Sequence, residues 1–136
     1  VAVGTSGNIL TSSDGSTWDS ATISTTYDNG TTEISNYTTN TLNDITYGNS
    51  TFVATGNSGT ILTSSNGTTW DNVTFTYDNG TTTNYTTNLL YDITYGNSTF
   101  VATGSSGTIL TSSDGSTWTS RTSGTSNTLN GITYIE

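Results

Sequence analysis

The ionisable side chains of this chain are few, and they limit the chemistry that it can perform. Ten carboxylates accompany a single cation, Arg121, and the 136 residues include no His, Cys, Met or Lys. Without an imidazole, a thiol or an amine, the chain cannot build a Ser-His-Asp triad, a cysteine nucleophile, a His or Cys metal site or a Schiff base. Asp44 and Asp92 each precede an Ile-Thr-Tyr segment, where acids usually cap turns. No facing pair of acids of the kind that glycoside hydrolysis needs stands out, and we expect no enzyme activity.

One group of oxygen-bearing side chains has the types that a hard cation prefers. Asp28, Asn29 and Glu33 lie in residues 27–33, and residues 77–82 repeat the beginning of that segment as Tyr-Asp-Asn-Gly-Thr-Thr. Carboxylate and amide oxygens bind calcium, but the full Asp-x-Asp-x-Asp-Gly spacing with its distal Glu is missing. An Asn-Gly hairpin that lengthens the edge of a sheet explains both segments. We therefore expect no metal and no cofactor.

The rest of the composition describes a polar β protein. Thr, Ser and Asn supply more than half of the residues, whereas helix formers such as Lys, Gln and Met are absent. Thr is β-branched and suits a pleated, half-buried surface, so we expect an all-β fold. The net charge of −9 has the wrong sign for binding nucleic acid or an anionic membrane surface. No apolar run approaches the ~20 residues that cross a bilayer, so we expect no membrane insertion.

Three near-copies of one unit organise the chain. Ile-Leu-Thr-Ser-Ser recurs at 9–13, 61–65 and 109–113, each time followed by Asp-Gly or Asn-Gly and then by Thr-Trp. Ile-Thr-Tyr-Gly-Asn and Phe-Val-Ala-Thr-Gly precede the second and third copies, and the Gly- and Asn-rich pairs between these segments are typical of hairpin turns. The pattern of each unit therefore predicts four short strands. A period of ~40–50 residues with four strands per unit is typical of propeller blades.

The units are out of phase with the chain ends. We expect a single domain, residues 1–136, made of three four-stranded propeller-blade-like repeats with hairpin insertions: residues 1–41 with 129–136, residues 42–89 and residues 90–128. The first unit lacks its Ile-Thr-Tyr strand, and an assembly strand at the C-terminus supplies one: Ile132, Thr133, Tyr134 and Ile135. This strand would complete the first blade in cis, or in trans from a neighbouring subunit. Because ordinary propellers have ~4–8 blades, a ring-closing dimer, a head-to-tail filament and a longer tandem array remain open, and the filament is favoured.

The segments 12–18, 64–70 and 112–118, called the Trp turns below, resemble a motif of a known family. Their Ser-Ser-Asp/Asn-Gly-Ser/Thr-Thr-Trp pattern is similar to that of the Asp-box, or bacterial-neuraminidase-repeat, propeller proteins, with Asp one residue closer to Gly. The resemblance implies that these turns are folding elements. Their structural residues are Asp14, Gly15, Trp18, Asn66, Gly67, Trp70, Asp114, Gly115 and Trp118. Some members are sialidases, but that activity uses a cluster of arginines, which one Arg cannot form.

Possible modification and contact sites lie mainly in turns and insertions. The Asn-x-Ser/Thr sequon occurs at Asn29, Asn36, Asn49, Asn66, Asn72, Asn79, Asn84 and Asn97. These asparagines would carry N-glycans in a cell that glycosylates its secreted proteins. Aromatic residues that recur once per unit, such as the tryptophans of the Trp turns and Tyr47, Tyr95 and Tyr134, are expected in the core. The tyrosines of the insertions are better candidates for contact with glycans or partners: Tyr27, Tyr37, Tyr77 and Tyr85.

These features favour a structural role over chemistry. We expect a non-enzymatic extracellular or cell-surface protein, a subunit of a fibre, filament or adhesin that self-associates by β-strand complementation. The alternative is a lectin-like glycan-binding propeller module.

Overall fold

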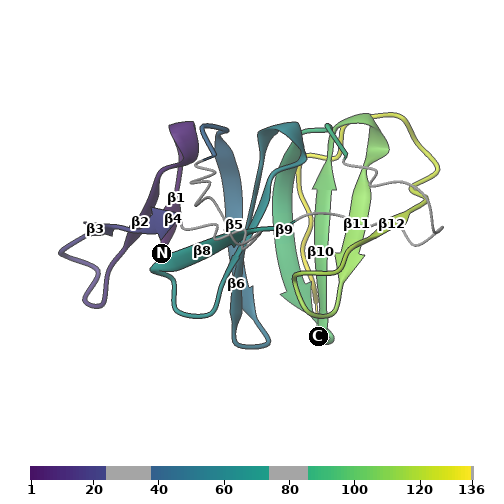
Figure 1. Cartoon of the computed structure of the whole chain (residues 1–136). Coiled ribbons are helices and arrows are strands. Elements are labelled where there is room, and N and C mark those ends of the chain that lie inside the picture. Colours follow the sequence, from purple (N-terminus) through teal and green to yellow (C-terminus); the bar gives the residue numbers. More distant parts are fainter. Residues whose placement is uncertain (24–37, 74–85, 136) are drawn as a thin grey trace, which may run out of the picture.

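The computed structural model describes residues 1–23, 38–73 and 86–135 and consists of consecutive sheets of short strands (Figure 1). Sheet 1 contains β1 (Ala2–Val3), β2 (Ile9–Thr11) and β3 (Asp19–Ser20). Sheet 2 contains β5 (Leu42–Gly48), β6 (Thr51–Gly56), β7 (Ile61–Ser64) and β8 (Thr69–Asn72). Sheet 3 contains β9 (Leu90–Gly96), β10 (Thr99–Gly104), β11 (Ile109–Ser112) and β12 (Thr119–Arg121). The expected all-β class is confirmed.

Each sheet is an antiparallel meander, and the described part of the chain closes none of them into a barrel. Sheets 2 and 3 have the four strands expected of a unit, whereas sheet 1 has three. The short strand β4 (Thr22–Ile23) adds a parallel edge to β8 and so links sheet 1 to sheet 2. The strand that sheet 1 lacks is the counterpart of β5 and β9, which we call the inner strands.

Sheets 2 and 3 have the same register along their first three strands. Ile45 pairs with Ala54 in sheet 2, as Ile93 pairs with Ala102 in sheet 3, and both inner strands have a register shift near their first residues. The hairpin between β5 and β6 turns at Asn49-Ser50, and the hairpin between β9 and β10 turns at Asn97-Ser98. The φ angles of these four residues lie between 46° and 58°. Positive φ at both central residues is the requirement of a type I′ turn, which Asn meets at low cost.

The second connection of each unit is a single turn of 3-10 helix: η1 (Thr5–Gly7), η2 (Asn57–Gly59) and η3 (Ser105–Gly107). The last glycine of each turn has φ near 70° and lies against the backbone carbonyl of a Thr further along the chain, so that a Cβ would collide with it. These carbonyls belong to Thr38, Thr86 and Thr125. The Ser-Gly pair therefore positions the chain that returns to the next inner strand.

The hydrophobic core has two parts, and each takes side chains from two consecutive sheets. Between sheets 1 and 2 the buried residues are Ile9, Leu42, Ala54, Leu62 and Trp70. Between sheets 2 and 3 they are Val53, Ile61, Leu90, Ile93, Phe100, Ala102, Leu110 and Trp118. The sheets therefore stack, with sheet 1 at one end of the described part and sheet 3 at the other (Figure 1). No helix in the described ranges is long and apolar enough to cross a membrane.

Candidate functional site

The Trp turn of sheet 1 is built around the carboxylate of Asp14. Its Oδ1 accepts hydrogen bonds from the backbone amides of Ser16 and Thr17, both at 2.8 Å, and its Oδ2 accepts the Thr17 hydroxyl at 3.0 Å. Ser12 closes the turn from the other side, because its Oγ accepts the Gly15 amide at 2.8 Å. These donors, the Thr17 amide first, hold the pKa of Asp14 well below its usual range. The acid is fully used in fixing the turn.

The other two Trp turns repeat this network. Asp114 binds the amides of Ser116 and Thr117 at 2.8 and 2.7 Å, and the Thr117 amide is the main cause of its lowered pKa. Asn66 makes the same two bonds at 2.9 Å with a neutral amide oxygen. Because Asn serves as well as Asp, the turn needs an acceptor at this position and not a charge.

The Trp turns of sheets 2 and 3 are also anchored to the preceding sheet. The indole nitrogens of Trp70 and Trp118 donate to the carbonyls of Gly67 and Gly115 at 2.9 and 2.8 Å, and both indoles are buried. A Cβ on Gly67 would approach Val1 of sheet 1, and a Cβ on Gly115 would approach Val53 of sheet 2. Each turn thus rests on the sheet before it.

The inner strands are joined to each other by a carboxylate and a glycine. The Oδ2 of Asp44 on β5 accepts the backbone amide of Ile93 on β9 at 2.8 Å. Near the other end of the same strands, the ring of Tyr95 lies on Gly48, where any Cβ would collide with it. A side chain at position 48 would separate β5 from β9, so the glycine permits the close approach of the two strands.

The C-terminal segment repeats these contacts beside β9. The Oδ2 of Asp92 accepts the amide of Ile132 at 2.7 Å, and the ring of Tyr134 lies on Gly96. The structure nevertheless assigns no strand to residues 122–135. In the single chain Ile132–Ile135 has no ladder partner among the described strands, so the pairing of this segment with a first blade stays a prediction.

Of the two ways to complete the first blade, the described structure does not show closure in cis. Residues 132–134 lie beside β9, next to sheet 3, while β1 is in sheet 1 at the other end of the stack (Figure 1). In the described part of the chain β1 is paired with β2 alone, whereas β6 and β10 each have a partner on both sides. The segment occupies the place of a further inner strand, and sheet 1 has three strands in the described part of the chain.

Asp44 and Asp92 form a carboxyl pair that sequence reasoning missed. Burial and the neighbouring Asp92 carboxyl, which lies within hydrogen-bonding reach, raise the pKa of Asp44 to about 6. The signal was available, because both acids precede Ile-Thr-Tyr and therefore occupy one position of the repeat. Asp44 accepts a backbone amide of β9 and Asp92 accepts one of the C-terminal segment, so both carboxylates hold neighbouring segments together.

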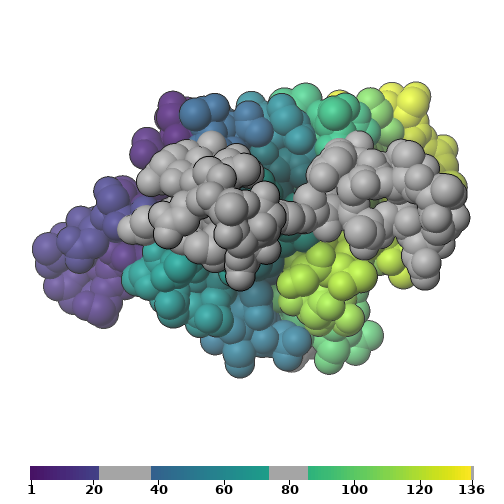
Figure 2. All heavy atoms as spheres, in the orientation of Figure 1, coloured from purple at the N-terminus to yellow at the C-terminus, as the bar shows by residue number. Residues whose placement is uncertain are grey.

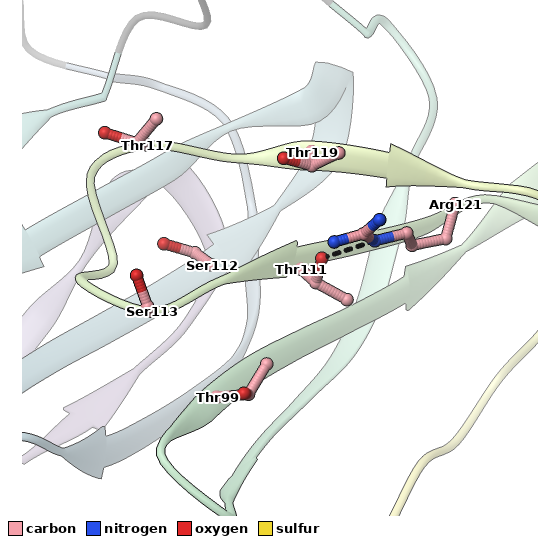
Figure 3. Close-up of a pocket in the computed structure, with 7 residues that line it drawn as sticks. All are labelled: Thr99, Thr111, Ser112, Ser113, Thr117, Thr119 and Arg121. Atoms are coloured by element: carbon pink, nitrogen blue, oxygen red, sulfur yellow. Dashed lines mark hydrogen bonds between the residues drawn. The ribbon is translucent and has the colours of Figure 1, made fainter.

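The outer face of sheet 3 carries a hollow of about 270 Å³ (Figure 3). Its lining includes the chain's one cation, Arg121, whose Nε donates to the Thr111 hydroxyl at 2.8 Å. The other lining residues are Thr99, Ser112, Ser113, Thr117 and Thr119. Within the part of the chain that the structure describes, Arg121 has no ion pair, and its head group lies over the strands of this face (Figure 3).

The sequons and insertions are placed only in part. Asn49, Asn66, Asn72 and Asn97 lie on the exposed surface, in turns or at the end of β8. The side-chain amide of Asn49 donates to the Ser113 carbonyl at 3.4 Å. The remaining sequons and the four insertion tyrosines lie outside the described residues: Asn29, Asn36, Asn79, Asn84, Tyr27, Tyr37, Tyr77 and Tyr85.

The recurring aromatic residues differ in exposure from unit to unit. Trp70 and Trp118 belong to the core, but Trp18 is 44% exposed, because no described sheet lies against the outer face of sheet 1. Tyr95 packs on the core, whereas Tyr47 and Tyr134 are exposed. Asp28, Asn29 and Glu33, which we weighed as calcium ligands and expect to form a hairpin, lie outside the described ranges. Within those ranges no cluster of His, Cys, Asp or Glu is placed to hold a metal.

Comparisons of the chain with protein families, curated proteins and solved structures find no match. Function must therefore be argued from the geometry above.

Proposed function

We propose that this chain is a non-enzymatic structural subunit of an extracellular fibre or adhesin, built from propeller-blade-like units and assembled head to tail by β-strand complementation. The C-terminal segment of one copy would supply the inner strand that sheet 1 of the next copy lacks. The observation that carries the proposal is the placement of Ile132 and Tyr134 beside β9, with the contacts that β9 itself makes to β5. This position supports the proposal, because it is where the inner strand of a further sheet would lie.

The register of the added strand follows from the two complete sheets. Ile45 and Ile93 pair with the Ala of the next strand, and Thr46 and Thr94 pair with the preceding Val. By the same pattern Ile132 would pair with Ala2, and Thr133 with Val1, of the next copy. Main-chain hydrogen bonds at an open edge give such strand addition its affinity.

Exposed apolar side chains on the two partners support this pairing. Ile135, at the repeat position of Gly48 and Gly96, is 87% exposed, and Tyr47 is 57% exposed. Tyr95 and Tyr134 each lie on the glycine of the preceding inner strand. Ile135 has a side chain at that position, so Tyr47 would pack beside the Ile135 side chain and the donated strand would lie farther from β5 at this end. Pairing would remove both apolar surfaces from water.

Competition with the isolated strand tests the proposal. A synthetic peptide of residues 129–136, added in excess, should occupy the open edge of β1 and shorten the assemblies seen by electron microscopy, whereas a scrambled peptide should not. Deletion of residues 131–136 should abolish the assemblies. Particles of unchanged length after this deletion would sink the proposal.

A further inference from the structure

The outer face of sheet 1 exposes surfaces that the other two sheets bury. A Cβ on Gly15 would meet no atom within 4 Å, whereas at Gly67 and Gly115 it would meet side chains of the preceding sheet. Trp18 is 44% exposed, against 0% for Trp70 and 7% for Trp118. Figure 2 shows the Trp turn of sheet 1 as the purple lobe that protrudes at one end of the molecule. The Trp turn of sheet 1 has the same hydrogen bonds to backbone amides as the Trp turns of sheets 2 and 3, but no described sheet lies beneath it.

The receiving surface is defined by the contact between sheets 2 and 3. Gly115 rests on Thr51, Val53 and Thr63 of sheet 2. Their repeat counterparts on the outer face of sheet 3 are Thr99, Val101 and Thr111, since β6 and β10, and β7 and β11, share one register. Thr99 and Thr111 line the hollow of Figure 3. The hollow therefore occupies the place that receives a Trp turn between sheets 2 and 3.

We infer that the outer face of sheet 3 is the docking site for the Trp turn of sheet 1 from a second copy of this chain. The inference rests on the proposed head-to-tail assembly and adds a second contact, from sheet face to sheet face, which is made by residues outside the C-terminal strand. Gly15 lies over Thr99 and Thr111 in the docked pair. Trp18 becomes buried, as Trp70 and Trp118 are within the chain.

Two polar groups on the receiving face complete the docked contact. Asn49 donates its side-chain amide to the Ser113 carbonyl, which anchors the Trp turn of sheet 3 to sheet 2. Asn97 occupies the same position of the hairpin on sheet 3, with the same φ of 46°. It is exposed, and in the docked pair it donates to the Ser13 carbonyl of the second copy.

Arg121 distinguishes this contact from those inside the chain. Its repeat counterparts are Val73 and Ala21, which both pack against the core clusters between sheets. Within the chain, Val73 packs against the cluster that contains Trp118. In the docked pair, Arg121 would take the equivalent position and face the second copy. In the docked pair the guanidinium would lie near the exposed indole of Trp18 and the carboxylates of sheet 1 of the second copy, a setting that suits a cation able to stack and to pair.

Site-directed cross-linking tests this contact. The chain has no native cysteine, so only the introduced cysteines can react. Ser13→Cys and Asn97→Cys are placed in separate preparations, mixed, and treated with a short bismaleimide. The double variant Asn49→Cys with Ser113→Cys calibrates the chemistry within one chain, because those two residues are in contact. Thr5→Cys, on the exposed surface of η1, replaces Ser13→Cys as the control for random collision.

We expect the Ser13→Cys and Asn97→Cys chains to form a cross-linked heterodimer at least tenfold faster than either variant forms a homodimer. The same heterodimer should also form at least tenfold faster than the one between Thr5→Cys and Asn97→Cys. The experiment is repeated on chains that lack residues 131–136. Heterodimers from full-length chains alone support docking that depends on the strand, and heterodimers in both forms support independent docking. Heterodimers no more abundant than the collision control overturn the inference. Loss of assembly on deletion, together with that result, would leave strand complementation standing, so the two failures are distinguishable.

Discussion

Two features of individual side chains have consequences for the free energy of unfolding. The first concerns the hydroxyls of Thr55 and Thr103, which are buried without a hydrogen-bond partner in the described part of the structure. Sheet 1 has Val3 at the same position, where it pairs with Ile9 as Thr55 pairs with Ile61. An unpaired buried hydroxyl costs free energy that an apolar group of the same shape avoids.

Thr55→Val should therefore raise the free energy of unfolding by about 1 kcal/mol, because it removes the unpaired hydroxyl and keeps the β-branched shape. Chemical denaturation monitored by tryptophan fluorescence measures the change. Thr5→Val, at an exposed position, serves as the control and should leave stability within about 0.5 kcal/mol. A loss of stability in Thr55→Val would mean that the hydroxyl is paired with a group outside the described residues.

The second feature is the raised pKa of Asp44, which makes stability depend on pH. A folded-state pKa of about 6, against an ordinary value of 3.8, means that the folded chain binds this proton more tightly than the unfolded chain. The resulting stabilisation is complete below the unfolded value and is lost as pH rises through about 6. Since the side chain is only half-buried, solvent reduces the effect to about 1 kcal/mol.

Asp44→Asn should flatten this pH dependence and raise the midpoint of thermal unfolding at pH 8. The Asn oxygen still accepts the Ile93 amide, and its NH₂ group can donate to Asp92 where two carboxylates would repel. Thermal scans between pH 4 and pH 8 measure the change. Asp71→Asn removes one exposed charge in sheet 2 and is the matched control. Equal pH profiles for the wild type and Asp44→Asn would contradict the assignment.

At the scale of the element, the contact between inner strands is what positions the C-terminal segment. Its geometry depends on a glycine beneath an aromatic ring, at Gly48 beneath Tyr95 and at Gly96 beneath Tyr134. The Asp92 carboxylate fixes the other end of the segment through the Ile132 amide. The segment is therefore held at two points and stays available for pairing along its backbone.

Gly96→Ala should release one of these two points. The added methyl collides with the Tyr134 ring, so amide hydrogen exchange at Ile132 and Tyr134 should become faster while exchange in β10 and β11 stays unchanged. Gly4→Ala is the matched control, because a Cβ there meets no atom within 4 Å and the backbone is extended. Unchanged exchange at Ile132 in Gly96→Ala would show that the ring does not hold the segment.

The sequence predicted the elements far better than the contacts between them. The repeated β-branched segments and the Gly- and Asn-rich pairs between them indicated the strands and turns, because those signals act within a few residues. The carboxyl pair of Asp44 and Asp92 is separated by a whole unit of sequence, and only the stacking of β5 against β9 brings it together. The state of Ile132–Ile135 depends on a partner strand, which no local pattern contains.

For the whole molecule, one pattern of contact continues from sheet to sheet. Sheet 2 rests on sheet 1 and sheet 3 on sheet 2 through the same Trp turn and the same glycine, although the side chains around them vary. In the proposed assembly, the outermost faces of the described stack would therefore be the two halves of one interface. A heterologous interface of this kind adds copies in one direction, and a rotation that does not close yields a filament.

Net charge opposes this assembly, and salt should therefore promote it. Each copy has a charge of −9, and Arg121 is its one cation, so two approaching copies repel over a distance that ions shorten. Mean particle length in light scattering should rise as sodium chloride increases from about 10 mM to about 500 mM, since the Debye length falls from ~30 Å toward ~4 Å. Arg121→Gln removes the cation and should make the salt dependence steeper. Particles that shorten as salt increases would contradict this prediction and would show that attraction between Arg121 and the carboxylates dominates the contact.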